Sequence, residues 1–144
     1  MRAIEDDLFG LLQWDTRGQE WQGTIIVGPH GEIGVVLPTE YVDSDETRQH
    51  IRATMKIIER DETGFRERAA NELFAHGGYA LFLADDEQFD HASFVNEMHL
   101  GMITFDPPDT RDPVVLWYEF GEGMEYGITI IVTWDGVYQY TRVA

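Results

Sequence analysis

The fold is decided by the stretch YGITIIVTWDGVYQYTR, residues 126–142. Its first half carries an apolar side chain at every second position, at Ile128, Ile130, Val132 and Trp134. A period of two is that of a β-strand with one face against the core. Asp135-Gly136 follows, a pair typical of a tight hairpin turn. The stretch therefore predicts a strand over Tyr126–Trp134 that pairs with a final strand over Val137–Arg142.

Further strands are expected on both sides of a helical middle. Runs rich in aliphatic, β-branched and aromatic residues predict them, at Leu8–Trp14, Glu20–Val27, Glu32–Leu37, Leu100–Phe105 and Val114–Phe120. The sequence Gly28-Pro29-His30-Gly31 predicts a turn that makes the second and third of these a hairpin. The loop Asp106–Pro113, with three prolines, separates the last two.

Residues 43–76 have the period of helices instead. Asp43 and Glu46 have the spacing of a capping box, with Ser44 as a further N-cap candidate. Apolar residues then recur three or four positions apart in two stripes, one at Ile51, Met55 and Ile58, the other within Glu62–His76 at Phe65, Ala69 and Leu73. Two glycines at 77–78 predict the end of the second helix. A third, short helix is expected at about His91–Met98.

Together these segments predict a single domain spanning residues 1–144. The expected class is α+β, an antiparallel sheet with two to three helices packed on one face, in the order βββ-ααα-ββββ. Apolar residues make up 43% of the chain, enough to build a core.

The charge is strongly acidic and unevenly distributed. Asp and Glu total 27 against 10 Lys and Arg, a net charge of −17. Residues 77–144 hold 12 of the acids and 2 of the bases, while residues 43–76 are nearly balanced, with 8 and 6. A field of this sign disfavours nucleic acid and anionic membranes as partners and favours a basic protein. The alternative is that the acidity only keeps the protein soluble and monomeric.

No cysteine occurs, which excludes disulfides, thiolate metal sites and cysteine nucleophiles. No apolar run has the length of a membrane span, and the first residues do not form an export signal. A cytoplasmic location is therefore expected. No two of the five histidines are three or four positions apart, so no helical metal clamp is predicted. We expect no metal, no cofactor and no locally encoded catalytic residues.

The candidate binding residues are aromatic and acidic. Trp117 and Tyr118 are adjacent in a strand and are expected on opposite faces, whereas Tyr138 and Tyr140 are expected to share one. If the helices cover only one face of the sheet, the other face would expose aromatic side chains rimmed by acids, a pattern typical of a protein-interaction surface. The rim candidates are Glu122, Glu125, Asp109 and Asp112. A further strand or a second subunit is the alternative cover for this face.

Three segments resemble an uncharacterised bacterial domain family, DUF-2262: FGLLQWD (Phe9–Asp15), WQGTIIV (Trp21–Val27) and the tail Leu116–Ala144. The family pattern includes a Gly-His pair after an aromatic-acidic strand and a final Asp-Gly hairpin. Gly127 matches the glycine, but Ile128 stands where the histidine would be. The resemblance implies no function, and any chemistry that depends on that histidine would be missing here.

The sequence favours a non-catalytic, acidic protein-binding module, for example an immunity-type protein that caps a basic toxin. An enzyme or small-ligand binder is the alternative, with a pocket between helices and sheet that uses His76, His91 or His99. Mimicry of nucleic acid by spaced carboxylates is a weaker alternative. Both a monomer and a homodimer are compatible with the sequence.

Overall fold

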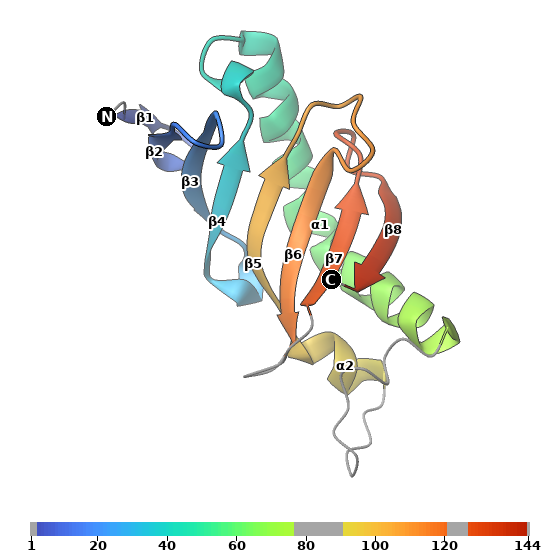
Figure 1. Ribbon diagram of the computed structural model, residues 1–144. Coiled ribbons are helices and arrows are strands. Elements are labelled where there is room, and N and C mark those ends of the chain that lie inside the picture. The colour runs from blue at the N-terminus through green and yellow to red at the C-terminus, as the bar shows by residue number, and fades with distance from the viewer. Residues whose placement is uncertain (1–2, 77–90, 121–126, 144) are drawn as a thin grey trace.

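The computed structural model describes residues 3–76, 91–120 and 127–143 (Figure 1). Eight strands form one sheet, and their order in space is their order along the chain. They are β1 (Ala3–Asp6), β2 (Gly10–Asp15), β3 (Glu20–Ile26), β4 (Glu32–Leu37), β5 (Met98–Phe105), β6 (Val114–Phe120), β7 (Gly127–Val132) and β8 (Tyr138–Val143). Two helices separate β4 from β5, α1 (Asp45–His76) and α2 (His91–Glu97).

The sheet is mixed. Neighbouring strands are antiparallel except β4 and β5, which run parallel with Gly34 opposite Met102 and Val36 opposite Thr104. Parallel neighbours cannot be joined by a hairpin, so the helical segment makes the crossover between them. Figure 1 shows α1 lying across one face of the sheet. Short 3-10 turns, Gly28–His30 and Thr39–Tyr41, follow β3 and β4.

The expected order βββ-ααα-ββββ and the purely antiparallel sheet are therefore wrong, although the α+β class is supported. The described residues give the order ββββ-αα-ββββ. The additional strand, β1, is only four residues long and half acidic, so it lacks an apolar pattern. It is nevertheless paired with β2 through four residues, from Ala3 opposite Gln13 to Asp6 opposite Gly10.

The two helices expected within residues 43–76 are a single helix of 32 residues. Its buried stripe is continuous because Glu62 occupies the position between Ile58 and Phe65 where an apolar residue is expected. That one polar residue made the pattern look interrupted. The helix begins with Ser44 as its cap, whose Oγ accepts a hydrogen bond from the Thr47 N–H at 3.1 Å.

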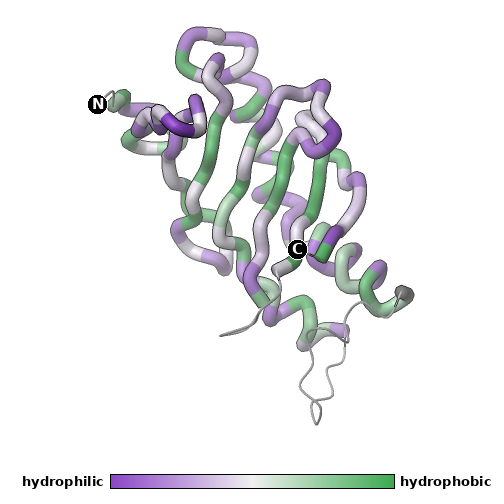
Figure 2. The backbone as a smooth tube through the Cα atoms, viewed as in Figure 1, coloured by the Kyte–Doolittle hydropathy of each residue, from purple (hydrophilic) through white to green (hydrophobic). Residues whose placement is uncertain are grey.

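The core lies between α1 and the inner face of the sheet. Side chains from α1 pack there against alternate residues of the strands, among them Ile51, Met55, Ile58, Ile103, Leu116, Ile130 and Val132. In Figure 2 the hydrophobic colour concentrates along the central strands and the hydrophilic colour on the connections at their ends. None of the described helices is long and apolar enough to cross a membrane.

Two irregularities in the strand register change which side chains share a face. In β5 the register shifts between Leu100 and Met102, which leaves Gly101 as the extra residue. In β8 Tyr138 lies opposite Val132 and Tyr140 opposite Ile131, so Gln139 is the extra residue. Tyr138 and Tyr140 therefore point to opposite faces, and the expectation that they share one is wrong.

Candidate functional site

The face of the sheet opposite α1 is covered by neither of the described helices (Figure 1). The strand registers place on it the residues that alternate with the core positions, namely Val36, His99, Met102, Thr104, Val115, Trp117, Glu119, Thr129, Ile131 and Tyr140. We call this set the open face. Its centre is apolar, since Val115 and Ile131 are buried there although they are not part of the main core.

Trp117 is the main exposed feature of the open face. It is 38% exposed, and no other described Phe, Tyr or Trp is as exposed. The indole N–H donates a hydrogen bond to Thr104 Oγ1 at 3.2 Å, which fixes the orientation of the ring. Met102 lies opposite Trp117 on β5, and Thr129 lies opposite it on β7. The indole is therefore held in place with part of its surface facing solvent.

A depression of about 300 Å³ lies beside this indole, lined by Gly101, Met102, Trp117, Tyr118 and Glu119. It coincides with the bulge at Gly101. A Cβ atom at Gly101 would meet nothing closer than the Trp117 carbonyl oxygen at 4.0 Å, so the missing side chain leaves open space. The carboxylate of Glu119 is exposed and forms no ion pair with the other described residues.

The edge of the open face at β8 is tied to the loop before β6. The Tyr140 hydroxyl donates to the Asp112 carboxylate, and Arg142 Nη1 lies 3.2 Å from Asp112 Oδ2. The hydrogen bond to this carboxylate, together with burial, raises the pKa of Tyr140. Asp112 therefore positions an aromatic side chain at the rim of the face.

Acidic side chains gather at the end of the sheet next to this loop. Two adjoining depressions of about 190 and about 280 Å³ share Pro38, Glu40 and Pro107 in their lining. Burial and the carboxylates of Asp15 and Asp106 raise the pKa of Glu20. Burial and the carboxylate of Asp112 likewise raise the pKa of Asp106. The loop end of the sheet is thus a region of mutually repelling carboxylates.

On the inner side of the sheet, a buried polar network surrounds Glu62. One carboxylate oxygen contacts His30 Nε2, and the other accepts a hydrogen bond from Arg66 Nε at 2.9 Å. The Tyr118 hydroxyl donates to Glu62 at 3.4 Å, and the Leu100 N–H donates to His30 Nδ1 at 3.1 Å. Burial alone would raise the pKa of Glu62, but the bonds and charges of His30 and Arg66 lower it overall.

This network crosslinks the fold. Both nitrogens of His30 have partners, and Arg66 Nη1 also donates to the Val95 carbonyl oxygen at 3.1 Å. His30 and Glu62, the groups of the network that could exchange protons, are therefore hydrogen-bonded to each other. The network also joins the turn after β3 to α1, α2 and β5.

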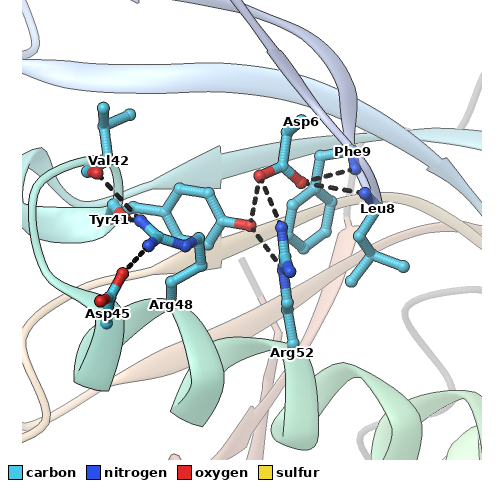
Figure 3. Close-up of polar contacts among 8 residues, drawn as sticks. All are labelled: Asp6, Leu8, Phe9, Tyr41, Val42, Asp45, Arg48 and Arg52. Atoms are coloured by element: carbon cyan, nitrogen blue, oxygen red, sulfur yellow. Dashed lines mark hydrogen bonds and ion pairs between the residues drawn. The ribbon is translucent and has the colours of Figure 1, made fainter.

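A second polar cluster, shown in Figure 3, holds β1 and β2 against α1. Asp6 accepts hydrogen bonds from the N–H groups of Leu8 and Phe9, each at 3.0 Å. It also accepts from the Tyr41 hydroxyl at 2.9 Å and from Arg52 Nη2 at 3.0 Å. Burial alone would raise the pKa of Asp6, but these four bonds lower it overall. Burial raises the pKa of Tyr41 to about 12.

The neighbouring arginine, Arg48, makes several polar contacts as well. Arg48 Nη1 donates to the carbonyl oxygens of Tyr41 and Val42 at 3.0 and 2.9 Å, and its Nη2 pairs with Asp45 (Figure 3). The depression beside these residues, about 200 Å³, is lined by both acidic and basic side chains. Its arginines act as ties between the helix and the preceding segments.

The structure separates the residues singled out from the sequence. Trp117, Tyr140 and Asp112 lie at the open face, and Asp109 is exposed in the loop beside it. Tyr118 and Tyr138 are buried on the helix side. Tyr138 packs there against Phe65, and the Cζ atom of Arg68 lies 4.2 Å from the centre of the Tyr138 ring. Glu122 and Glu125 lie outside the described residues.

The histidines proposed for a small-molecule site lie on different elements. His91 is in α2 against Phe74, and His99 is exposed on the open face opposite Glu119. The side chain of His76 lies outside the described residues. Within the described ranges, no group of three or more His, Asp or Glu side chains could hold a metal ion.

The sequence did not predict the buried pair of His30 and Glu62, although a glutamate inside an apolar helix stripe is a detectable signal.

Comparison with known proteins finds no match to the chain: no family model, no curated protein and no solved structure matches it.

Proposed function

We propose that this chain is a non-catalytic, acidic protein-binding module that docks a basic partner protein through its open face. The observation that carries the proposal is Trp117, a residue that is 38% exposed, with its indole held in place, on a sheet face that neither described helix covers. Tryptophan is among the residues most enriched at binding hot spots because it buries a large area at a low cost in conformational entropy.

The composition of the open face supports protein docking. Trp117 is exposed and Met102, opposite it on β5, is half-buried, whereas Val115 and Ile131 at the centre are already buried within the chain. Burial of apolar surface stabilises a complex by about 25 cal/mol per Å² before the costs of association. An exposed indole with an apolar neighbour, next to charged groups, has the composition of a specific protein interface.

The charge supports a basic partner. The net charge is −17, and the acids beside the open face include Glu119, Asp112 and Asp106. Such a field accelerates encounter with a positively charged surface, and the acceleration is lost when salt screens it. We include in the proposal a cytoplasmic location, which suits a chain without cysteine, and an immunity-type role, in which the partner is a basic toxin.

Paired capture experiments test this proposal. Tagged wild-type protein, Trp117→Ala and Val137→Ala serve as baits for a lysate of the cell of origin. Val137 is 55% exposed but lies in the turn before β8, so its variant controls for the loss of exposed apolar surface. We expect wild type and Val137→Ala to retain the same basic protein, and Trp117→Ala to retain at least about tenfold less.

Salt provides the second arm of the experiment. Retention should fall between low salt and about 1 M salt, because the charge contribution is screened. Equal retention by wild-type and Trp117→Ala baits would contradict docking at the open face. An acidic protein as the retained partner would contradict the role of charge.

A further inference from the structure

We infer that the depression beside Trp117 receives an arginine side chain of the basic partner, with the guanidinium paired to Glu119. This inference rests on the proposed function and specifies the chemistry that the partner presents. It follows from the shape of the depression, from the two kinds of surface that line it, and from the Glu119 carboxylate, which forms no ion pair with the other described residues.

The shape comes from the bulge in β5. Leu100 lies opposite Tyr118 and Met102 opposite Trp117, so Gly101 is inserted without a partner of its own. Among the described residues, apart from its two neighbours in the chain, only the Trp117 carbonyl oxygen lies within 4 Å of a Cβ placed there. The resulting space, about 300 Å³, is at the lower limit of pockets that hold small molecules and suits a single long side chain.

The lining is apolar on one side and charged on another. The Trp117 ring and the Met102 side chain provide surface for a chain of methylene groups. The face of an indole also attracts a guanidinium or ammonium group. Glu119, two residues from Trp117 on the same strand, presents its carboxylate on the same face of the sheet.

Arginine fits this arrangement better than lysine. Its planar guanidinium can stack on the indole and pair with a carboxylate through two parallel N–H groups, whereas an ammonium ion is a compact, strongly hydrated charge. Most other exposed carboxylates in the part of the chain that the structure describes lie on loops or helices, but Glu119 is two residues from the exposed Trp117. This pairing distinguishes the depression from the general acidity of the surface.

Peptide titration followed by two-dimensional amide NMR tests the inference. The probe is acetyl-Gly-Arg-Gly-amide, and the control peptide replaces arginine with citrulline, which has the same shape without the charge. We expect saturable shifts of the Gly101 and Glu119 amides and of the Trp117 indole N–H with the arginine peptide. The citrulline peptide should bind at least about fivefold more weakly.

Three protein variants make the test specific. Glu119→Gln should remove the preference for arginine over citrulline. Glu32→Gln, which changes the net charge equally at an exposed position on β4, should retain it. Gly101→Val fills the depression without removing a contact and should abolish the shifts from both peptides.

Several outcomes would overturn the inference: shifts spread over the acidic surface, equal affinity for the two peptides, or an equal effect of Glu32→Gln and Glu119→Gln. These outcomes are independent of the capture experiment. A partner that depends on Trp117 but is retained equally by Glu119→Gln would leave the proposed function intact and reject the arginine pocket. A partner that Trp117→Ala retains as well as wild type does would reject the proposed function itself.

Discussion

Glu62, in the middle of α1, faces His30 in the turn between β3 and β4, and its carboxylate contacts the Nε2 atom of that imidazole. Because the Leu100 N–H donates to Nδ1, the ring must carry its proton on Nε2 when it is neutral. The pair is therefore oriented from both sides, and its geometry depends on α1, β5 and the turn at once.

Glu62→Gln is expected to lower the free energy of unfolding by about 2–4 kcal/mol, because it removes the charge partner of a buried arginine, Arg66. Glu59→Gln changes the same residue type at an exposed position of the same helix and should change stability by less than about 0.5 kcal/mol. Urea denaturation followed by circular dichroism measures both. Equal effects of the two substitutions would show that the network contributes no specific stability.

Asp6 should make stability dependent on pH in the acidic range. A carboxyl group whose pKa is lower in the folded than in the unfolded protein stabilises the fold above its unfolded pKa, and this stabilisation is lost as pH falls through the folded pKa. Asp6→Asn should therefore cost about 1–2 kcal/mol at neutral pH and progressively less below about pH 4. Denaturation midpoints measured across this range test the prediction. A cost that stays constant down to acid pH would contradict it.

The acids beside Pro107 should have the opposite effect. The pKa of Glu20 is raised in the folded protein, so its ionised carboxylate lowers the free energy of unfolding at neutral pH. This loss of stability disappears as pH falls through the raised pKa. Glu20→Gln is expected to stabilise the protein at neutral pH by a few tenths of a kcal/mol, a small effect because the group is partly solvated. Thermal melting at low and high salt provides the check, since screening should reduce the gain. Destabilisation at neutral pH would contradict the role of repulsion.

Gly136 is required for two separate reasons. Its φ of 75° favours glycine, and a Cβ there would lie 2.4 Å from the Ile57 Cγ2 atom on α1. Gly31 has a similar φ, 71°, but a Cβ there would meet nothing within 4 Å. Gly31→Ala should therefore cost about 1–2 kcal/mol through backbone strain alone, and Gly136→Ala about 1–3 kcal/mol more through overpacking.

The double variant Gly136→Ala with Ile57→Ala tests the steric part. Ile57→Ala removes the Cγ2 and Cδ1 atoms but keeps Cβ, which would still lie 2.9 Å from an added Cβ at position 136. The added cost of Gly136→Ala should therefore fall in this background but stay above that of Gly31→Ala. Chemical denaturation of Gly31→Ala, Gly136→Ala, Ile57→Ala and the double variant measures these costs. A cost that is unchanged in the Ile57→Ala background would assign the whole effect to backbone conformation.

Regular apolar patterns were sufficient to predict most of the elements. The bounds of β6, Val114–Phe120, and β4, Glu32–Leu37, agree with the prediction, and so does the placement of Trp117 and Tyr118 on opposite faces. Both segments are short runs rich in aliphatic and aromatic residues, and each is bounded by glycine and proline. The pattern depends only on local sequence, so it can be read without knowing the partners.

The failures occurred where a contact distant in sequence overrides the local pattern. β1 exists because Asp6 is held by Tyr41 and Arg52, which no local pattern reveals. α1 is continuous because Glu62 is paired with Arg66 and hydrogen-bonded to His30 inside the core. Neither the parallel pairing of β4 with β5 nor the extra residue Gln139 in β8 has a sequence signal that determines it.

The parallel contact between β4 and β5 also bears on how the chain folds. In every other strand pair the two strands are joined by a short connection, so β1–β4 and β5–β8 are each built from contacts that close short loops. Only the register from Gly34–Met102 to Val36–Thr104 joins segments that are far apart in the chain. Closing a long loop is entropically costly and slow. We therefore expect β1–β4 and β5–β8 to form early in folding. The pairing of β4 with β5 should be the step that limits the folding rate.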